Sequence, residues 1–233
     1  MEVPNSIDVV ILSYAQSPAL FKTTVECIDS LMASEDRSEI QFRIVVIESE
    51  KKLKPYKYKN ATTIYPDEPF GYHRYMNIGI QMTNSPFICL CNNDLIFHRG
   101  WASEMLKVFN LYPSLLSASP ACSIHHPKMG IPINSGVLPG YRIRYEVAGW
   151  CLFVRREIFK IIGELDENYK FWCADNDYAN TLWVLNIGHV LVTSSVVDHL
   201  ESRTLYSQSN EIQEELTEQE VYYFDKKWKH RLG

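Results

Sequence analysis

The sequence predicts a single α/β domain over residues 1–233, with a mostly parallel central sheet flanked by helices. Two apolar runs, residues 7–12 and 42–47, lack regular alternation, which is typical of strands buried on both faces of a parallel sheet. Between them, residues 20–31 place apolar side chains at helical spacing, so a strand–helix–strand unit opens the chain. The length of 233 residues allows a substantial core.

The remaining elements follow from the same patterns. Ser17 is a favoured N-cap and Pro18 fits the first helical position, so we expect the first helix to run from there to about Met32. Further strands are expected at residues 61–65, 87–91, 149–154 and 189–193. Further helices are expected at residues 72–82, 101–111, 157–162, 175–185 and 211–228. Residues 51–59 and 113–147 show no strong period and indicate loops.

Composition and charge narrow the classes of function. The formal net charge of -5 gives no general attraction to nucleic-acid phosphates or anionic membranes. No apolar run approaches the roughly 18 residues that a membrane span needs, and residues 1–5 do not resemble a secretory signal. The six cysteines lack zinc-site spacing and lie mostly in apolar runs, which favours buried free thiols. We therefore expect a cytoplasmic protein without a transmembrane segment.

Polar residues follow three of the expected strands. These clusters are Ser13-Tyr14, Glu48-Ser49-Glu50 and Asn92-Asn93-Asp94. Because open α/β sheets bind ligands at the carboxyl ends of their strands, we expect the three clusters to form one site. Each cluster alone also fits a turn, since Ser, Asn and Asp favour turns.

The sequence lacks the glycine-rich motifs that usually bind phosphates in this architecture. It contains neither GxGxxG after the first strand nor GxxxxGK[ST], which argues against a dinucleotide fold and a P-loop. It also lacks the GxSxG nucleophile elbow. If a diphosphate binds here, a carboxylate-held divalent cation is the natural alternative, because Mg²⁺ and Mn²⁺ prefer oxygen ligands.

Four stretches resemble one known family in their order. They are the opening strand 9–14, the helix segment 71–79, the strand 87–94 ending in Asn-Asn-Asp, and a late signature at 149–156, 163–167 and 175–177. This order resembles family-2-type inverting glycosyltransferases with the GT-A fold, whose DXD motif often takes the Asn-Asn-Asp form. The resemblance runs from about residue 7 to His199, and Lys227-Trp228 resembles the end of the family's sequences more weakly.

The resemblance implies roles for individual residues. Donor contacts would come from Ser13, Tyr14, Glu48, Arg74, Asn77, Asn92 and Asn93. Asp94 and His199 would hold the divalent cation, Mn²⁺ or Mg²⁺, that bridges the two donor phosphates. Asp175 would be the general base, and Arg203 is a looser candidate for a phosphate contact. Residues 1–112 would then bind the nucleotide sugar, and residues 113–233 the acceptor.

The acceptor side leaves alternatives open. Asp175 also fits the first turn of a helix, where acids favour the dipole, and Ala174 stands where the family has a second carboxylate. Trp150, Trp172 and Asp177 are the candidates for contact with acceptor or sugar, and the sequence does not choose between the two tryptophans as a stacking platform. The histidines at 125 and 126 favour a solvated loop over a metal site.

The predicted function is inverting transfer of a sugar from a nucleoside-diphosphate sugar, with UDP favoured, to an acceptor hydroxyl. Such displacement needs a stabilised leaving diphosphate and a base for the hydroxyl, which a divalent cation and a carboxylate provide. A polysaccharide precursor is the favoured acceptor, and a hydroxylated base in viral DNA is the alternative. Two further alternatives are a non-catalytic nucleotide-sugar-binding protein and a sugar nucleotidyltransferase. The latter would normally show a glycine-rich basic loop, which residues 13–16 lack.

Overall fold

The computed structural model describes residues 5–51, 55–200, 210–229 and 231, with side chains of the last helix described from Glu218 onward. The strands are β1 Asn5–Ser13, β2 Ile40–Glu48, β3 Ala61–Ile64, β4 Phe87–Asn92, β5 Leu95–Phe97, β6 Ser117–Ala121, β7 Val137–Pro139, β8 Cys151–Arg155 and β9 His189–His199. The helices are α1 Pro18–Ala33, α2 Tyr72–Gln81, α3 Trp101–Leu111, α4 Phe159–Ile162, α5 Ala174–Val184 and α6 Asn210–Trp228. Two 3₁₀ turns span His126–Met129 and Arg156–Ile158.

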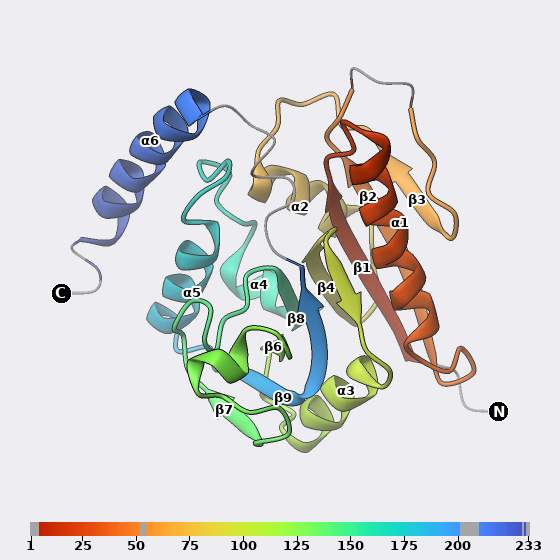
Figure 1. The fold of residues 1–233 in the computed structure, drawn as a ribbon. Helices are drawn as coiled ribbons and strands as arrows, with labels where there is room; N and C mark the ends of the chain where they lie inside the picture. Colours follow the sequence, from red (N-terminus) through yellow and green to blue (C-terminus); the bar gives the residue numbers. More distant parts are fainter. Residues whose placement is uncertain (1–4, 52–54, 201–209, 230, 232–233) are drawn as a thin grey trace.

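The strands form one mixed sheet in the order β3-β2-β1-β4-β8-β6-β9-β5, with β7 paired to β9 (Figure 1). β1 lies parallel to β2 and β4, and β3 lies parallel to β2. β8 runs antiparallel to both of its neighbours, β4 and β6. The expected parallel arrangement is therefore confirmed for the first half of the sheet, whereas the second half is mixed.

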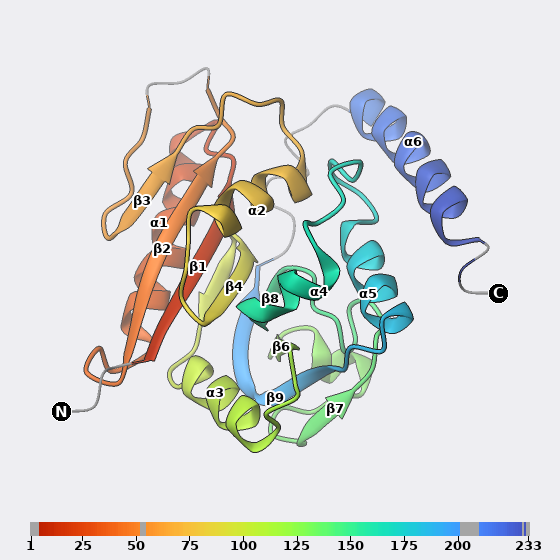
Figure 2. The same cartoon turned by 180° about the vertical axis from the view of Figure 1, so that it is seen from behind.

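Helices cover both faces of the sheet, as Figures 1 and 2 show from opposite sides. On β1, Val9 packs into the core under α1 and α3, whereas its neighbour Val10 packs with Met76 of α2. This explains the apolar run without alternation, because both faces of β1 are buried. Gly79 permits the close contact of α2 with β1, since a Cβ atom there would lie 2.3 Å from Val10 Cγ1.

Most predicted elements are confirmed. Ser17 caps α1, because its Oγ accepts a hydrogen bond from the Leu20 amide at 3.2 Å. The short strands β5, β6 and β7 were not predicted, and β9 continues past Thr193 to His199. Strands of three to five residues show little periodicity, and β6 and β7 also contain prolines, which are poor indicators of a strand.

The expected free thiols are confirmed for all six cysteines, of which Cys173 alone is half-buried rather than buried. Among the described helices, none combines the length and the apolar character needed to cross a bilayer. The division into a nucleotide-sugar half and an acceptor half stays a prediction, and Arg203 lies outside the described residues.

Candidate active site

The carboxyl ends of β1, β2 and β4 meet at one edge of the sheet. The parallel register pairs Ser13 with Glu48 and Leu12 with Asn92. The three polar clusters singled out in the sequence therefore lie side by side, which confirms the expected convergence of strand ends.

Buried hydrogen bonds link these strand ends. The Tyr58 hydroxyl donates to the Glu48 carboxylate at 2.7 Å and lies 3.1 Å from Ser13 Oγ. Ser13 Oγ lies 2.9 Å from the Thr24 hydroxyl, which accepts a hydrogen bond from Asn93 Nδ2 at 2.8 Å. Hydrogen-bonded chains of this kind rigidify a buried site when every member is satisfied. The network fixes the turn after β1 relative to the turn after β4.

Two predicted donor contacts have an internal role instead. The Ser13 and Glu48 side chains are fully buried, and Glu48 Oε1 accepts the amides of Ala15 and Glu50 at 3.0 and 2.9 Å. They hold the backbone beyond β1 and β2, and a contact of either residue with a donor stays a prediction. Tyr14 is half-buried, and burial raises the pKa of its phenol, with a contribution from the nearby acidic charges of Glu50 and Glu48.

Asp94 and His199 come together through the unpredicted strand β5. The antiparallel register of β5 and β9 pairs Leu95 with His199, so His199 Nε2 lies 3.3 Å from Asp94 Oδ1. This separation fits two ligands in adjacent positions of one octahedral ion, because ligand distances of about 2.1 Å put neighbouring ligand atoms roughly 3 Å apart. No cluster of three or more metal-binding His, Cys, Asp or Glu side chains occurs in the described part of the chain. Phosphate oxygens and water would have to complete the coordination.

The imidazole of His199 is held by an aromatic neighbour. The Trp150 ring stacks on it, with centroids 5.1 Å apart and an interplanar angle of 4°. His125 Nε2 lies 3.0 Å from the His199 carbonyl oxygen, and the Trp150 carbonyl accepts the Asn92 amide at 2.9 Å. One face of Trp150 thus orients His199 instead of facing a sugar.

The sequence favoured a solvated loop for His125 and His126. This expectation is wrong for His126, which is buried and has both ring nitrogens hydrogen-bonded.

A pocket of about 390 Å³ joins this edge of the sheet to α5. Five residues singled out in the sequence line the pocket: Asn92, Trp150, Trp172, Asp175 and His199. Aromatic and apolar side chains form much of its remaining wall, including Tyr72, Phe171, Ile143, Leu152 and Val221. The structure therefore brings together five of the side chains that the sequence singled out.

Asp175 occupies the first turn of α5 and faces the chain just before β8. A Cβ atom on Gly149 would lie 2.6 Å from Asp175 Cβ and 2.9 Å from its Oδ2, so only glycine leaves room for this carboxylate. Burial raises the pKa of Asp175, although hydrogen bonds from backbone amides act in the opposite direction. A carboxylate with a raised pKa is a stronger proton acceptor.

Replacing Gly149 with alanine should displace Asp175 and lower turnover of a nucleotide sugar. We expect a loss of about 10²-fold, because a displacement near 1 Å at a catalytic group has effects of this size. Steady-state kinetics would measure it, with UDP affinity as the control. An unchanged turnover number would show that the position of Asp175 does not matter.

Two predicted donor residues on α2 bind protein groups. The Asn77 side chain donates to the Leu165 carbonyl at 2.9 Å and accepts the Leu165 amide at 3.0 Å. Arg74 Nε donates to the Glu167 carboxylate at 2.8 Å. Both residues fix the segment before α5 to α2 and lie outside the pocket lining, and their contact with a donor stays a prediction.

Asp177 is also placed differently from the prediction. It is buried, accepts a hydrogen bond from Trp228 Nε1 at 2.8 Å and pairs with Lys227 Nζ at 2.7 Å. It therefore anchors α6 and does not line the pocket. Its neighbour Asp175 lines the pocket, so the first turn of α5 carries both side chains.

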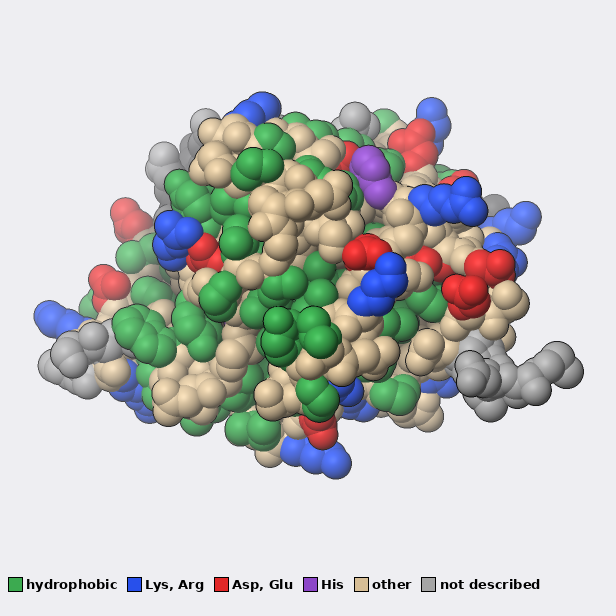
Figure 3. Space-filling view, turned by 90° about the horizontal axis from the view of Figure 1, so that it is seen from below, with side chains coloured by type: hydrophobic (Ala, Val, Ile, Leu, Met, Phe, Trp, Pro, Cys, Tyr) green, Lys and Arg blue, Asp and Glu red, His purple; other side chains and the backbone are tan. Residues whose placement is uncertain are grey.

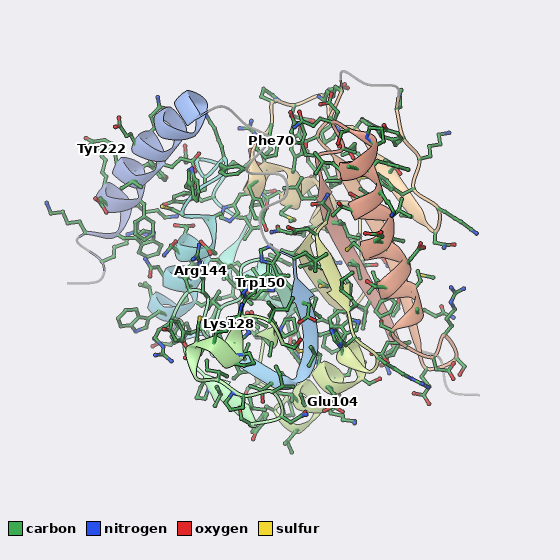
Figure 4. All side chains as sticks on the ribbon, viewed as in Figure 1. Phe70, Glu104, Lys128, Arg144, Trp150 and Tyr222 are labelled. Atoms are coloured by element: carbon green, nitrogen blue, oxygen red, sulfur yellow. The ribbon has the colours of Figure 1, made fainter. Side chains whose placement is uncertain are left out.

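The sequence did not single out Arg144, which also lines the pocket. Arg144 is exposed and has a left-handed backbone with φ of +69°. Such a conformation is uncommon for a residue other than glycine and often marks a functional position. Figure 4 shows Arg144 and Trp150 together between α5 and the sheet. A guanidinium here can attract an anionic part of a ligand.

Comparisons agree with this arrangement. Residues 8–130 match the sequence model of Glycosyl transferase family 2. No curated protein matches the chain significantly. The crystal structure of GalNAc-T7 with UDP, GalNAc and Mn²⁺ is similar with a TM-score of 0.67 and 13% identity, covering 85% of this chain and 44% of that one.

Two further structures are similar. The catalytic domain of Drosophila β1,4-galactosyltransferase 7, complexed with xylobiose, has a TM-score of 0.58 and 15% identity over 88% of this chain and 75% of that one. The structure of S. aureus TarS 1–349 has a TM-score of 0.60 and 11% identity over 82% of this chain and 59% of that one. At such low identities these likenesses establish the fold.

The sheet, its flanking helices and the polar strand ends define a GT-A glycosyltransferase fold. Because the family model matches more than half of the sequence, the chain belongs to Glycosyl transferase family 2. The chain spans less than half the length of the GalNAc-T7 chain.

Proposed function

We propose that the chain transfers a sugar from UDP-sugar to an acceptor hydroxyl with inversion at the anomeric carbon. The proposal rests on one observation, which is that Asn92, His199 and Asp175 all line the same pocket. In a direct displacement, the leaving diphosphate and the attacking hydroxyl lie on opposite sides of the anomeric carbon. A pocket lined both by His199, which pairs with Asp94, and by the Asp175 carboxylate suits such a displacement.

On the donor side, Asp94 and His199 would hold a divalent cation. Its chemistry, when bound, is to neutralise the charge that develops on the departing diphosphate. The pair fits one ion by its separation of 3.3 Å. Tyr14 and Asn92 would contact the nucleotide, since both are half-buried and follow or end neighbouring strands of the sheet. UDP is favoured since the similar GalNAc-T7 structure contains UDP and Mn²⁺.

On the acceptor side, Asp175 would take the proton from the attacking hydroxyl. Its carboxylate lines the pocket and its pKa is raised by burial, which suits a general base. Position 174 supplies no second carboxylate, since Ala174 is a buried apolar residue at the start of α5. The proposed mechanism therefore relies on one carboxylate, that of Asp175.

The acceptor is proposed to be a saccharide, such as a polysaccharide precursor. Tyr72, Phe171 and Trp172 give the pocket aromatic walls, and aromatic rings pack well against the apolar faces of sugars. On the face seen in Figure 3, basic and acidic side chains are interspersed. This face offers no continuous basic surface for a nucleic-acid backbone, which places the modified-DNA alternative second.

UDP together with Mn²⁺ should raise the melting temperature of the chain more than UDP alone does. Ligands that bind only the folded state stabilise it, by about 2.7 kcal/mol at one hundred times the dissociation constant. In Asp94→Asn the Mn²⁺-dependent part of the shift should disappear, as measured by thermal denaturation. The exposed Asp29→Asn on α1 is the matched control and should keep the full shift. If the Mn²⁺-dependent shift in melting temperature is the same in Asp94→Asn as in wild type, Asp94 is not a ligand of the metal.

A further inference from the structure

The segment between α4 and α5, residues 163–173, carries part of the pocket wall. Phe171, Trp172 and Cys173 line the pocket directly, and Asp175 follows in the first turn of α5. On one side this segment is tied to α2, because the Tyr72 amide donates to the Lys170 carbonyl at 2.7 Å. Its other side contacts α6, which lies beside α5 in both Figures 1 and 2.

Glu220 of α6 makes an unusual contact with this segment. Its carboxylate accepts hydrogen bonds from three successive backbone amides, those of Lys170 at 3.2 Å, Phe171 at 3.0 Å and Trp172 at 2.6 Å. Glu220 is only 3% exposed. Successive amides that converge on one anion form a concave anion site, and here a side chain from the same chain occupies it. Charge-assisted hydrogen bonds of this kind are stronger than neutral ones.

A second contact holds α6 independently of Glu220. Lys227 Nζ lies 2.7 Å from both Asp166 Oδ2 and Asp177 Oδ1, and Tyr223 donates to Asp166 at 3.0 Å. These three charged side chains are each mostly buried. Because the Lys227 contacts flank the segment at both ends, α6 can stay docked when the Glu220 contact is weakened.

The next residue along α6 reaches the pocket itself. Val221 lines the same pocket as Asp175 and Trp172. The helix is therefore placed both to close one side of the pocket and to hold the backbone from which Trp172 projects.

We propose that Glu220 is a positioning residue for the reaction, and that α6 forms part of the acceptor site. The Glu220 carboxylate fixes the backbone of residues 170–172, which sets Trp172 and the start of α5 relative to the donor. This inference rests on the proposed role of Asp175 as general base. Glu220 acts on Asp175 through the backbone and touches no substrate.

The test uses water as the acceptor, so it does not require the natural acceptor. Release of UDP from a panel of UDP-sugars with Mn²⁺ is measured for the full chain and for Glu220→Gln. Glutamine offers one carbonyl oxygen to three amides and turns its own amino group toward them. We expect the turnover number to fall by about 10- to 100-fold, as for other small displacements of catalytic groups. UDP affinity, measured by calorimetry, should not change.

The matched control is Glu218→Gln, which makes the same substitution on the exposed side of the same helix and should behave as wild type. If Glu220→Gln does not fold, Glu220→Asp, which keeps the charge and retracts it by one methylene, is measured with the same criterion. Wild-type turnover in a folded Glu220 variant would overturn the inference, as would equal losses of turnover and UDP affinity.

Asp175→Asn in the same assay separates this inference from the proposed function. Loss of turnover in Asp175→Asn but not in the Glu220 variants would leave the proposed function intact and overturn only the role of Glu220. Full turnover in Asp175→Asn would overturn the role of Asp175 as the base and this inference with it, whereas no turnover in a wild-type chain that binds UDP would overturn the proposed function.

Discussion

Replacing Asp175 with asparagine should lower sugar transfer and UDP-sugar hydrolysis by about 10²- to 10⁴-fold, the range expected for loss of a general base. Asparagine matches aspartate in size, so the close approach to Gly149 is preserved. UDP affinity should stay the same, because the proposed role of Asp175 is to take a proton and not to bind the diphosphate. Steady-state turnover and calorimetry measure the two quantities separately.

The same substitution should not destabilise the fold. Burial raises the pKa of Asp175 above its ordinary value of 3.8, so the folded state binds a proton more readily than the unfolded state. The stabilising contribution of this group is therefore fully present below the unfolded pKa and is lost as the pH rises through the folded pKa. At neutral pH the ionised Asp175 opposes folding, and Asp175→Asn should unfold at the same or a higher urea concentration.

The pH dependence provides an independent check on the base. Asp175 accepts a proton only when it is ionised, so the acid limb of the turnover profile should lie above pH 3.8. Full transfer activity in a folded Asp175→Asn chain would rule out Asp175 as the base.

The sequence predicts the ends of buried strands well and the partners of polar side chains poorly. Asn92 and Asp94 are predictable because the apolar pattern of β4 is strong, whereas Asp175 is predicted by the family resemblance, since α5 has only a weak apolar face. His199 was predicted beside them by its motif, but its contact with Asp94 depends on β5, a strand of three residues with no period of its own. Such pairing arises from tertiary packing, which local patterns do not encode.

Asn77 shows that the residue type at a motif position does not identify the group that the side chain binds. Asparagine suits both a ligand contact and a buried backbone contact, and its residue type is the same in either case. Only the fold reveals that it binds both polar groups of Leu165. Glu220 illustrates the converse, because nothing in its charged, weakly periodic helix distinguishes it from an exposed glutamate such as Glu218. Its three amide partners lie about fifty residues away along the chain, beyond any local pattern.

A buried ion cluster at the opposite end of β1 should dominate the stability of the sheet. Asp8 is fully buried, and its carboxylate pairs with Arg43 Nε and Arg156 Nη2, each at 2.8 Å. It also accepts the Ser85 amide at 2.5 Å. Arg156 reaches Asp8 from the turn after β8, so one carboxylate joins both halves of the chain.

Asp8→Asn should lower the free energy of unfolding by about 3 to 5 kcal/mol, the range for removing one partner of a buried ion pair. The value should lie near the lower figure, because the Arg43 side chain is 50% exposed and water screens part of its charge. Urea denaturation at neutral pH measures the loss. The control is Asp29→Asn, the same change at an exposed site on α1.

The difference between wild type and Asp8→Asn should shrink in acid. Burial alone would raise the pKa of Asp8, but hydrogen bonds from Arg43 and Ser85 outweigh it and hold the pKa below 3.8. A lowered folded pKa contributes stability that is fully present above the unfolded pKa and is lost as the pH falls through the folded pKa. The two chains should therefore converge in stability only below about pH 3.8. If the difference were already lost at pH 5, the ionised form of Asp8 would not be what stabilises the sheet, and the two arginines would act mainly through packing.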